Sequence, residues 1–279
     1  MNRKISRVLV DILLYGFLVV ISLYMILPFV WMVSSSLKPE SEIFSVPPII
    51  FSKNMTLDAY KTVIVDGNIL RVLVNTFIIA ASATIARLFF CSLGGFGFAK
   101  YKFIGKGPLF AVLVATLVVP FSVTLIPLFV IMSRLKWTNT FLPLIIPGAA
   151  SAFGIFFMRQ YISTINNELL DSARIDGASE FSIFLRIILP IVAPGMTSLG
   201  LIFFMGSWND FLWPLVILKK PELFTLPIAI NQMIQSMIGR PVYSQQMAAA
   251  VISIIPLLII FLVFQRRFVE GITAGAVKG

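Results

Sequence analysis

The feature that most constrains this chain is a series of six apolar stretches that approach or exceed the length needed to cross a lipid bilayer. They run over about 12–33, 72–98, 108–132, 141–158, 194–218 and 247–264. A transmembrane helix needs about 20 such residues. Hydrophobic residues form 58% of the 279-residue chain and charged residues only 12%, so a water-soluble globule could not cover its apolar surface. The sequence therefore predicts an all-α integral membrane protein with six transmembrane helices in a single domain over 1–279.

Two apolar stretches need interpretation. The first follows three basic residues, as in a signal peptide, but it is about 22 residues long. The apolar region of a signal peptide has roughly 7–15 residues, so we interpret this stretch as a retained first span. Another stretch, 181–193, is too short to span and is interrupted by Arg186, which favours a buried or interfacial helix.

The basic residues predict the orientation of the chain. The formal net charge is +10, from 22 Lys and Arg against 12 Asp and Glu. With the N-terminus inside, twelve of the 22 fall on cytoplasmic segments and eight on longer external loops, in agreement with the positive-inside rule. The basic excess therefore indicates that both termini are cytoplasmic, and it gives no reason to expect a nucleic-acid partner. The first external loop, about 38–70, is long enough to fold on a neighbour or to bind something.

Missing residue types exclude several functions. The sequence has no His and one Cys, Cys91, so it lacks a Ser-His-Asp triad, a zinc-protease motif and a disulfide. It also lacks the G-x-x-x-x-G-K-[ST] loop that binds nucleotide phosphates. We therefore expect a chain that is not an enzyme and that holds no metal or cofactor.

The predicted cytoplasmic segment 159–193 differs from the other loops. Asn166 or Asn167 can cap a first helix. Ile165, Leu169 and Ala173 recur at four-residue spacing and form an apolar stripe along that helix. Four of the twelve acidic residues of the chain also lie here, namely Glu168, Asp171, Asp176 and Glu180.

A glycine turn follows this helix. Gly177 predicts a left-handed C-cap, a second helical stretch begins near Ser179, and Pro190 marks its end or a kink. An exposed apolar stripe rimmed by charges has to be covered. The cover is either a partner or the chain's own helices, and composition leaves both open.

These residues resemble the EAA signature of ABC importer permeases, which reads E-A-A-x₃-G-x₉-I-x-L-P. The positions concerned are Asp171, Ser172, Ala173, Asp176, Gly177, Ile187, Leu189 and Pro190. Two of them depart from the signature, because Asp stands for Glu and Ser for the first Ala. The stretches ARIDGA (173–178), WNDF (208–211) and the tail 264–279 are also similar to the carbohydrate-uptake (maltose-type, MalG-like) permeases. The likeness covers nearly the whole chain.

The resemblance implies a permease subunit that moves a sugar or oligosaccharide into a bacterial or archaeal cell across the cell membrane. The implied partners are a MalF-like second permease, two cytoplasmic ATPase subunits that bind ATP and Mg, an extracytoplasmic sugar-binding protein, and the lipid bilayer. The EAA loop would couple the ATPases to the spans. The C-terminal tail would also contact the ATPases, through Gly275, Lys278 and Gly279.

Polar residues inside a predicted span suggest a translocation path. Asp210 is the one acidic residue deep in a span, and an intramembrane charge usually faces a partner or water. Next to Trp208 and Asn209 it could bind sugar hydroxyls while the ring stacks on C–H faces. Alternatively, Asp210 has a structural role, in which it pairs with Arg71 or Arg87 or lies near the outer end of the fifth span.

Two other classes of protein are less well supported. An ion-driven secondary transporter of a small polar solute would show an inverted repeat, broken helices and a relay of ionisable groups. The sequence has one such Asp and no obvious repeat. A membrane enzyme is disfavoured because the chain has no His and no G-x-S-x-G elbow.

Overall fold

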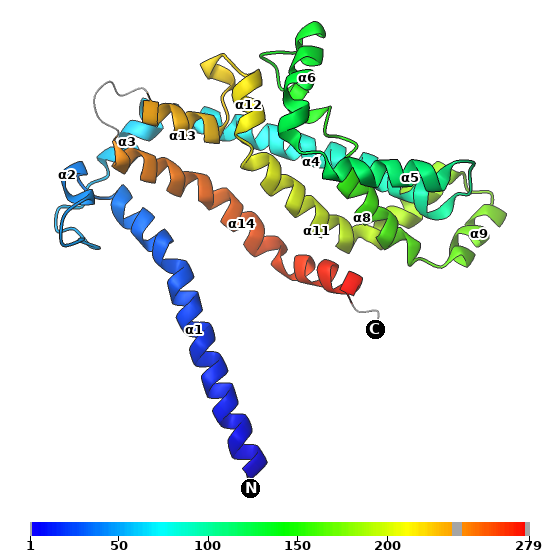
Figure 1. Cartoon of the computed structure of the whole chain (residues 1–279), viewed down its shortest axis with the longest axis horizontal. Helices are drawn as coiled ribbons and strands as arrows, with labels where there is room; N and C mark the ends of the chain where they lie inside the picture. The colour runs from blue at the N-terminus through cyan, green and yellow to red at the C-terminus, as the bar shows by residue number, and fades with distance from the viewer. Residues whose placement is uncertain (1, 236–241, 277–279) are drawn as a thin grey trace. The chain divides into compact units, whose positions relative to one another are not determined.

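The computed structural model describes residues 2–235 and 242–276, with the side chains of 10–233 and 242–265. Every regular element in these residues is a helix (Figure 1). The chain divides into two compact units, the first from Met1–Ile69 with Ile230–Ile255 and the second from Leu70–Ala229 with Pro256–Gly279. An all-helical membrane protein is the class that the sequence predicts.

Four helical runs are long and apolar enough to cross a membrane. They are the Val10–Ser36 part of α1 (Asn2–Ser36), α4 (Ile69–Lys100), the run Glu180–Trp208, and the Tyr243–Gln265 part of α14 (Tyr243–Ala276). A fifth results if Lys106–Val118 and Phe121–Arg134 form one span, although they meet at an angle of 102°. The described helices thus supply four or five spans by length, where the sequence predicts six.

The first unit contains α1, α2 (Glu40–Ile43), α3 (Asp58–Val65) and the start of α14. The most apolar 18-residue stretch of α1 has no buried residue. Glu40 accepts hydrogen bonds from the backbone N–H groups of Tyr243 (2.8 Å) and Ser244 (3.0 Å). Because these groups lie in the first turn of α14, the carboxylate satisfies donors that a helix leaves unpaired. The loop 38–70 therefore folds against the chain itself.

The core of the second unit lies where α4, α8 (Ala152–Ser163) and the run Glu180–Trp208 meet. Cys91, Met158 and Phe184 are fully buried there. Gly95 allows α4 to pack closely on α8. A Cβ at this position would lie 2.7 Å from Met158 Cβ and 2.8 Å from the backbone nitrogen of Arg159.

The run Glu180–Trp208 corrects the prediction for 181–193. It consists of α10 (Glu180–Ile183), a π-helical turn η2 (Phe184–Ile188) and α11 (Leu189–Trp208). The helix therefore continues through Pro190, which neither ends it nor starts a separate interfacial helix. A π turn widens the backbone just before Pro190, whose ring would clash with a regular preceding turn.

Three predicted spans are interrupted. Span 108–132 divides into α5 (Lys106–Ala115) with the 3₁₀ turn η1 (Thr116–Val118), and α6 (Phe121–Arg134). Span 141–158 divides into α7 (Leu142–Ile145) and α8, and span 194–218 into α11 and α12 (Leu212–Ile217). The first break is explained by Pro120, which holds Val119 in an extended conformation (φ −76°, ψ 114°). The short η3 (Pro221–Leu223) and α13 (Leu226–Gln235) follow α12.

The glycines of α4 provide a test of this packing. We expect Gly95→Ala to lower the free energy of unfolding by about 1–3 kcal/mol, because the added methyl meets the backbone of α8. Gly97→Ala is the matched control, since no atom lies within 4 Å of its added Cβ and alanine favours a helix. Thermal unfolding in detergent measures both variants, and equal midpoints would contradict the packing described.

Candidate functional site

The segment predicted as helix, glycine turn, helix has that structure. Asn166 caps α9 (Asn167–Ile175) by accepting from the N–H of Glu168 at 3.2 Å. At the other end, Gly177 has φ +80°. The N–H of Ala178 donates to the carbonyl of Ala173, and the N–H of Gly177 to that of Arg174, both at 3.0 Å. These two bonds form a Schellman motif, so the predicted left-handed C-cap is confirmed.

One face of α9 packs on the core of the second unit. Leu170 is 1% exposed and belongs to the same buried cluster as Ile183 and Phe184, with Ala173 packed against it. Leu169, which the sequence places in the apolar stripe, is 43% exposed. Ile165 and Ala173 do pack against this core, as the stripe predicts, whereas Leu169 does not and Leu170 is buried in its place. The chain's own helices therefore cover the apolar face of α9.

A polar network fixes the angle between α9 and the helix that follows it. Arg174 contacts Asp171 Oδ1 and Glu180 Oε1, each at 2.8 Å. The hydroxyl of Tyr101 donates to the other oxygen of Glu180. Burial and this hydrogen bond raise the pKa of Tyr101 to about 12, so the phenol remains a neutral donor at physiological pH. The two carboxylates raise the pKa of Arg174 further above its ordinary value.

A second tie joins α4 to the start of α9. Lys100 Nζ donates to the carbonyl of Ile165 and, at 2.8 Å, to Asn167 Oδ1. The sequence singles out neither Lys100 nor Tyr101 as functional. The i, i+3 spacing of Asp171 and Arg174 was the only available signal for this network.

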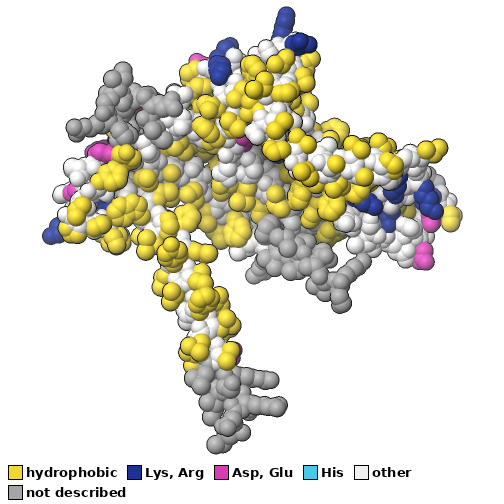
Figure 2. Space-filling view, viewed as in Figure 1, with side chains coloured by type: hydrophobic (Ala, Val, Ile, Leu, Met, Phe, Trp, Pro, Cys, Tyr) yellow, Lys and Arg dark blue, Asp and Glu magenta, His cyan; other side chains and the backbone are white. Residues whose placement is uncertain are grey.

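The remaining face of α9 and its turn is open. Asp171, Ser172, Asp176 and Gly177 are exposed, Ile175 is 87% exposed, and Phe181 is also exposed. Charged side chains gather at this end of the second unit (Figure 2). Of the other EAA positions, Ala173, Ile187 and Leu189 pack against the core and Pro190 is exposed. The segment thus presents an acidic and apolar surface on a fixed base.

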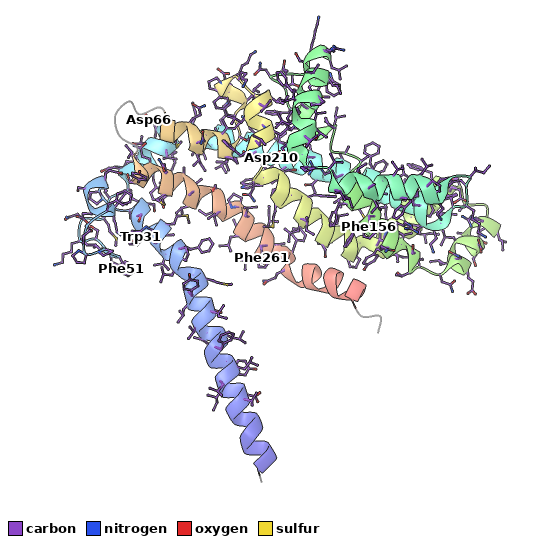
Figure 3. All side chains as sticks on the ribbon, viewed as in Figure 1. Trp31, Phe51, Asp66, Phe156, Asp210 and Phe261 are labelled. Carbon is purple, nitrogen blue, oxygen red and sulfur yellow. The ribbon has the colours of Figure 1, made fainter. Side chains whose placement is uncertain are left out.

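The predicted path residues lie in different environments. Trp208 is 2% exposed and stacks on Phe204 with ring centroids 5.6 Å apart. Asn209 is exposed and donates to the carbonyl of Met205 at 2.9 Å. Of the three, only Asp210 lines a cavity, which has a volume of about 430 Å³. It lies where α6, α11 and α12 come together (Figure 3).

Arg87, which the sequence names as a candidate partner of Asp210, lines the same cavity. It donates to the carbonyl of Gly148 (3.3 Å) and to Ser207 Oγ (3.0 Å). Among the described side chains, no ion pair within 4 Å joins Asp210 to Arg87 or to Arg71. Asp210 thus has no direct ion pair with either arginine, although it faces the same cavity as Arg87.

The tail residues are only partly described. Gly275 lies in the last turn of α14, and Lys278 and Gly279 lie outside the described residues. Within the described part of the chain, no group of three or more His, Cys, Asp or Glu side chains could hold a metal ion.

Comparisons with known proteins give the class of this fold. A crystal structure of a bacterial ABC transporter that imports the acidic polysaccharide alginate contains a chain with the same fold. The TM-score is 0.82 at 22% identity, over 94% of this chain and 98% of that one. Residues 91–274 match the family of binding-protein-dependent transport system inner membrane components. The fold is that of a permease subunit of this family.

Curated relatives agree over the full length. The chain is 33% identical to the arabinooligosaccharides transport system permease AraQ of Halalkalibacterium halodurans, over all of both chains. It is 31% identical to the lactose transport system permease LacG of Rhizobium radiobacter, again over all of both chains. The chain therefore belongs to the binding-protein-dependent transport system inner membrane components. It is a transport permease subunit and not an enzyme.

The network around Arg174 can be tested by amide exchange. We expect Arg174→Gln to accelerate exchange over 167–178 by no more than about fivefold, since exposed ion pairs contribute about 1 kcal/mol or less. Arg186→Gln is the control, because Arg186 is exposed and forms no ion pair within the described segment. Mass spectrometry of the deuterated complex measures both. Equal exchange in the two variants would show that the Arg174 network does not help to hold α9.

Proposed function

We propose that this chain is one of two permease subunits of an ABC importer for a sugar or oligosaccharide, driven through α9 and its glycine turn by a separate ATPase. The observation that carries the proposal is the combination of a fixed inner face and an open outer face on one short helix. Leu170 and Arg174 hold α9 to the membrane helices, while Asp171, Ile175 and Asp176 remain available to a partner. A protrusion of this kind passes on displacement because it cannot move independently of its base.

The partners follow from the family and from the chain's own composition. A permease without a nucleotide-binding loop needs a separate ATPase that holds ATP and Mg, and α9 is the surface we assign to it. A second, MalF-like permease completes the membrane domain and an extracytoplasmic binding protein delivers the sugar. One related assembly, the alginate transporter, was solved with its substrate-bound periplasmic protein.

The substrate class rests on the relatives. Arabinooligosaccharides and lactose appear in the names of two full-length relatives, and both are neutral sugars. Uptake and ATP hydrolysis of the reconstituted complex, across a panel of neutral and acidic oligosaccharides, would identify the substrate. Stimulation by none of the sugars would overturn the sugar assignment.

Six membrane crossings remain our proposal for the topology. In that arrangement the interrupted pairs α5–α6 and α7–α8 each complete one crossing, and both termini are cytoplasmic. Broken helices were expected of the rival class, the ion-driven secondary transporter. Their presence gives that class no advantage here, because the family match assigns the chain to the binding-protein-dependent importers.

Gly177 offers a test of coupling. We expect Gly177→Val to leave membrane insertion intact but to reduce sugar uptake relative to ATP hydrolysis. No atom lies within 4 Å of an added Cβ, so the cost comes from φ +80° alone, about 1–2 kcal/mol. Gly177→Asn is the control, since asparagine tolerates this conformation. Uptake and ATPase assays on one preparation measure the ratio, and wild-type coupling in the valine variant would remove the assignment.

The orientation can be tested with cysteines, because Cys91 is fully buried. In a Cys91→Ala background, we expect a membrane-impermeant thiol reagent to label Lys219→Cys in intact cells. It should label Asp176→Cys only in inverted vesicles, since both positions are exposed but lie on opposite sides of the proposed membrane. The reverse pattern would invert the topology.

A further inference from the structure

The second unit has a cavity with a mixed polar and apolar lining where its helices are interrupted. Arg87 reaches it from the unbroken α4, and Phe121 and Thr124 from the first turn of α6. Gly148 lies between α7 and α8, and Asp210 between α11 and α12. All three helix breaks therefore border one space. Irregular backbone at membrane depth is tolerated where it lines a cavity or is buried in protein.

The cavity lining carries one positive and one negative side chain, Arg87 and Asp210. Arg87 is a hydrogen-bond donor and Asp210 a hydrogen-bond acceptor, and no ion pair within 4 Å joins them. Two of the guanidinium nitrogens of Arg87 already donate to Gly148 and Ser207. An added anion would be attracted by Arg87 and repelled by Asp210, whereas a neutral polyhydroxylated molecule can donate to one and accept from the other.

The lining also includes aromatic surface. Phe121 and Trp213 pack edge to face with centroids 5.9 Å apart, and the indole N–H of Trp213 is anchored to the carbonyl of Pro143 at 2.9 Å. The volume of about 430 Å³ falls within the range of small-molecule sites, about 300–1,000 Å³. Fixed aromatic faces beside separated donor and acceptor groups are suited to a sugar ring.

We infer that this cavity binds one or two neutral sugar rings of the transported molecule, with Arg87 donating to and Asp210 accepting from sugar hydroxyls. The inference rests on the proposed function and extends it, because it gives this chain its own contacts with the sugar. Trp208 takes no part, since it packs on Phe204 outside the lining.

Two variants test the site. Asp210→Asn removes the acceptor charge at constant shape, and Glu222→Gln removes an exposed charge of the same unit that does not line the cavity. Leu128→Trp fills the cavity from α6, and Val123→Trp places the same bulk on an exposed position of that helix. Each variant thus has a matched control.

The probe is the tritiated sugar that gives the greatest uptake in the panel. Its binding is measured by equilibrium dialysis on the permease–ATPase complex in nanodiscs, without the binding protein. We expect Asp210→Asn to weaken binding roughly tenfold, as for loss of a hydrogen bond to a charged group. Leu128→Trp should abolish binding of a trisaccharide before that of a disaccharide, and both controls should bind as the wild type does.

The outcomes separate the inference from the proposed function. If the wild type shows sugar uptake but no variant changes binding, or if the wild-type complex binds no sugar, the cavity is not the site. If a uronic-acid disaccharide competes as well as a neutral one, the neutral assignment is wrong. If Asp210→Asn does not assemble, Leu128→Trp decides alone. If the wild type shows no binding-protein-dependent uptake, the proposed function itself fails.

Discussion

Peptide groups at membrane depth have no water to bond with, so every interruption of a helix has to be satisfied from within the protein. The second unit depends on this constraint. Arg87 and Trp213 satisfy the carbonyls of Gly148 and Pro143 beside the interrupted helices. The unbroken α4 thus supports its interrupted neighbours. A guanidinium that would be costly in lipid serves here as a source of donors.

The other end of the same unit is held by different means. Leu170 anchors α9 through burial, and Arg174 sets the angle of the turn through two carboxylates. Apolar burial provides most of the attachment, because exposed ion pairs contribute little each. The ion pairs instead select one geometry among those that burial alone would allow. The cavity end and the α9 end of the unit are therefore built in the same way. At each end, a few polar side chains hold a shorter helical segment against a long helix.

Much of this organisation could be predicted from the sequence. The length of the apolar stretches predicted the fold class. Asn166 and Gly177 predicted the two ends of α9, because helix caps depend on the residue type at a single position. The helix breaks were not predicted, since a hydropathy window cannot distinguish a proline that interrupts a helix from one that a π turn accommodates. Pro120 ends a helix and Pro190 does not. The cavity was also missed, because it brings together residues that are up to 135 positions apart in the sequence, from Ile79 to Pro214.

The continuity of α10, η2 and α11 has a mechanical consequence. These 29 residues form a rod about 43 Å long at 1.5 Å per residue. One end carries Glu180 and the turn at Gly177, and the other ends at Trp208, beside Ser207 and Asp210 on the cavity wall. Pivoting such a rod by 5° about its midpoint would move each end by about 2 Å in opposite directions, given this length. A small tilt imposed at α9 would thus reach the cavity wall as a displacement of atomic size.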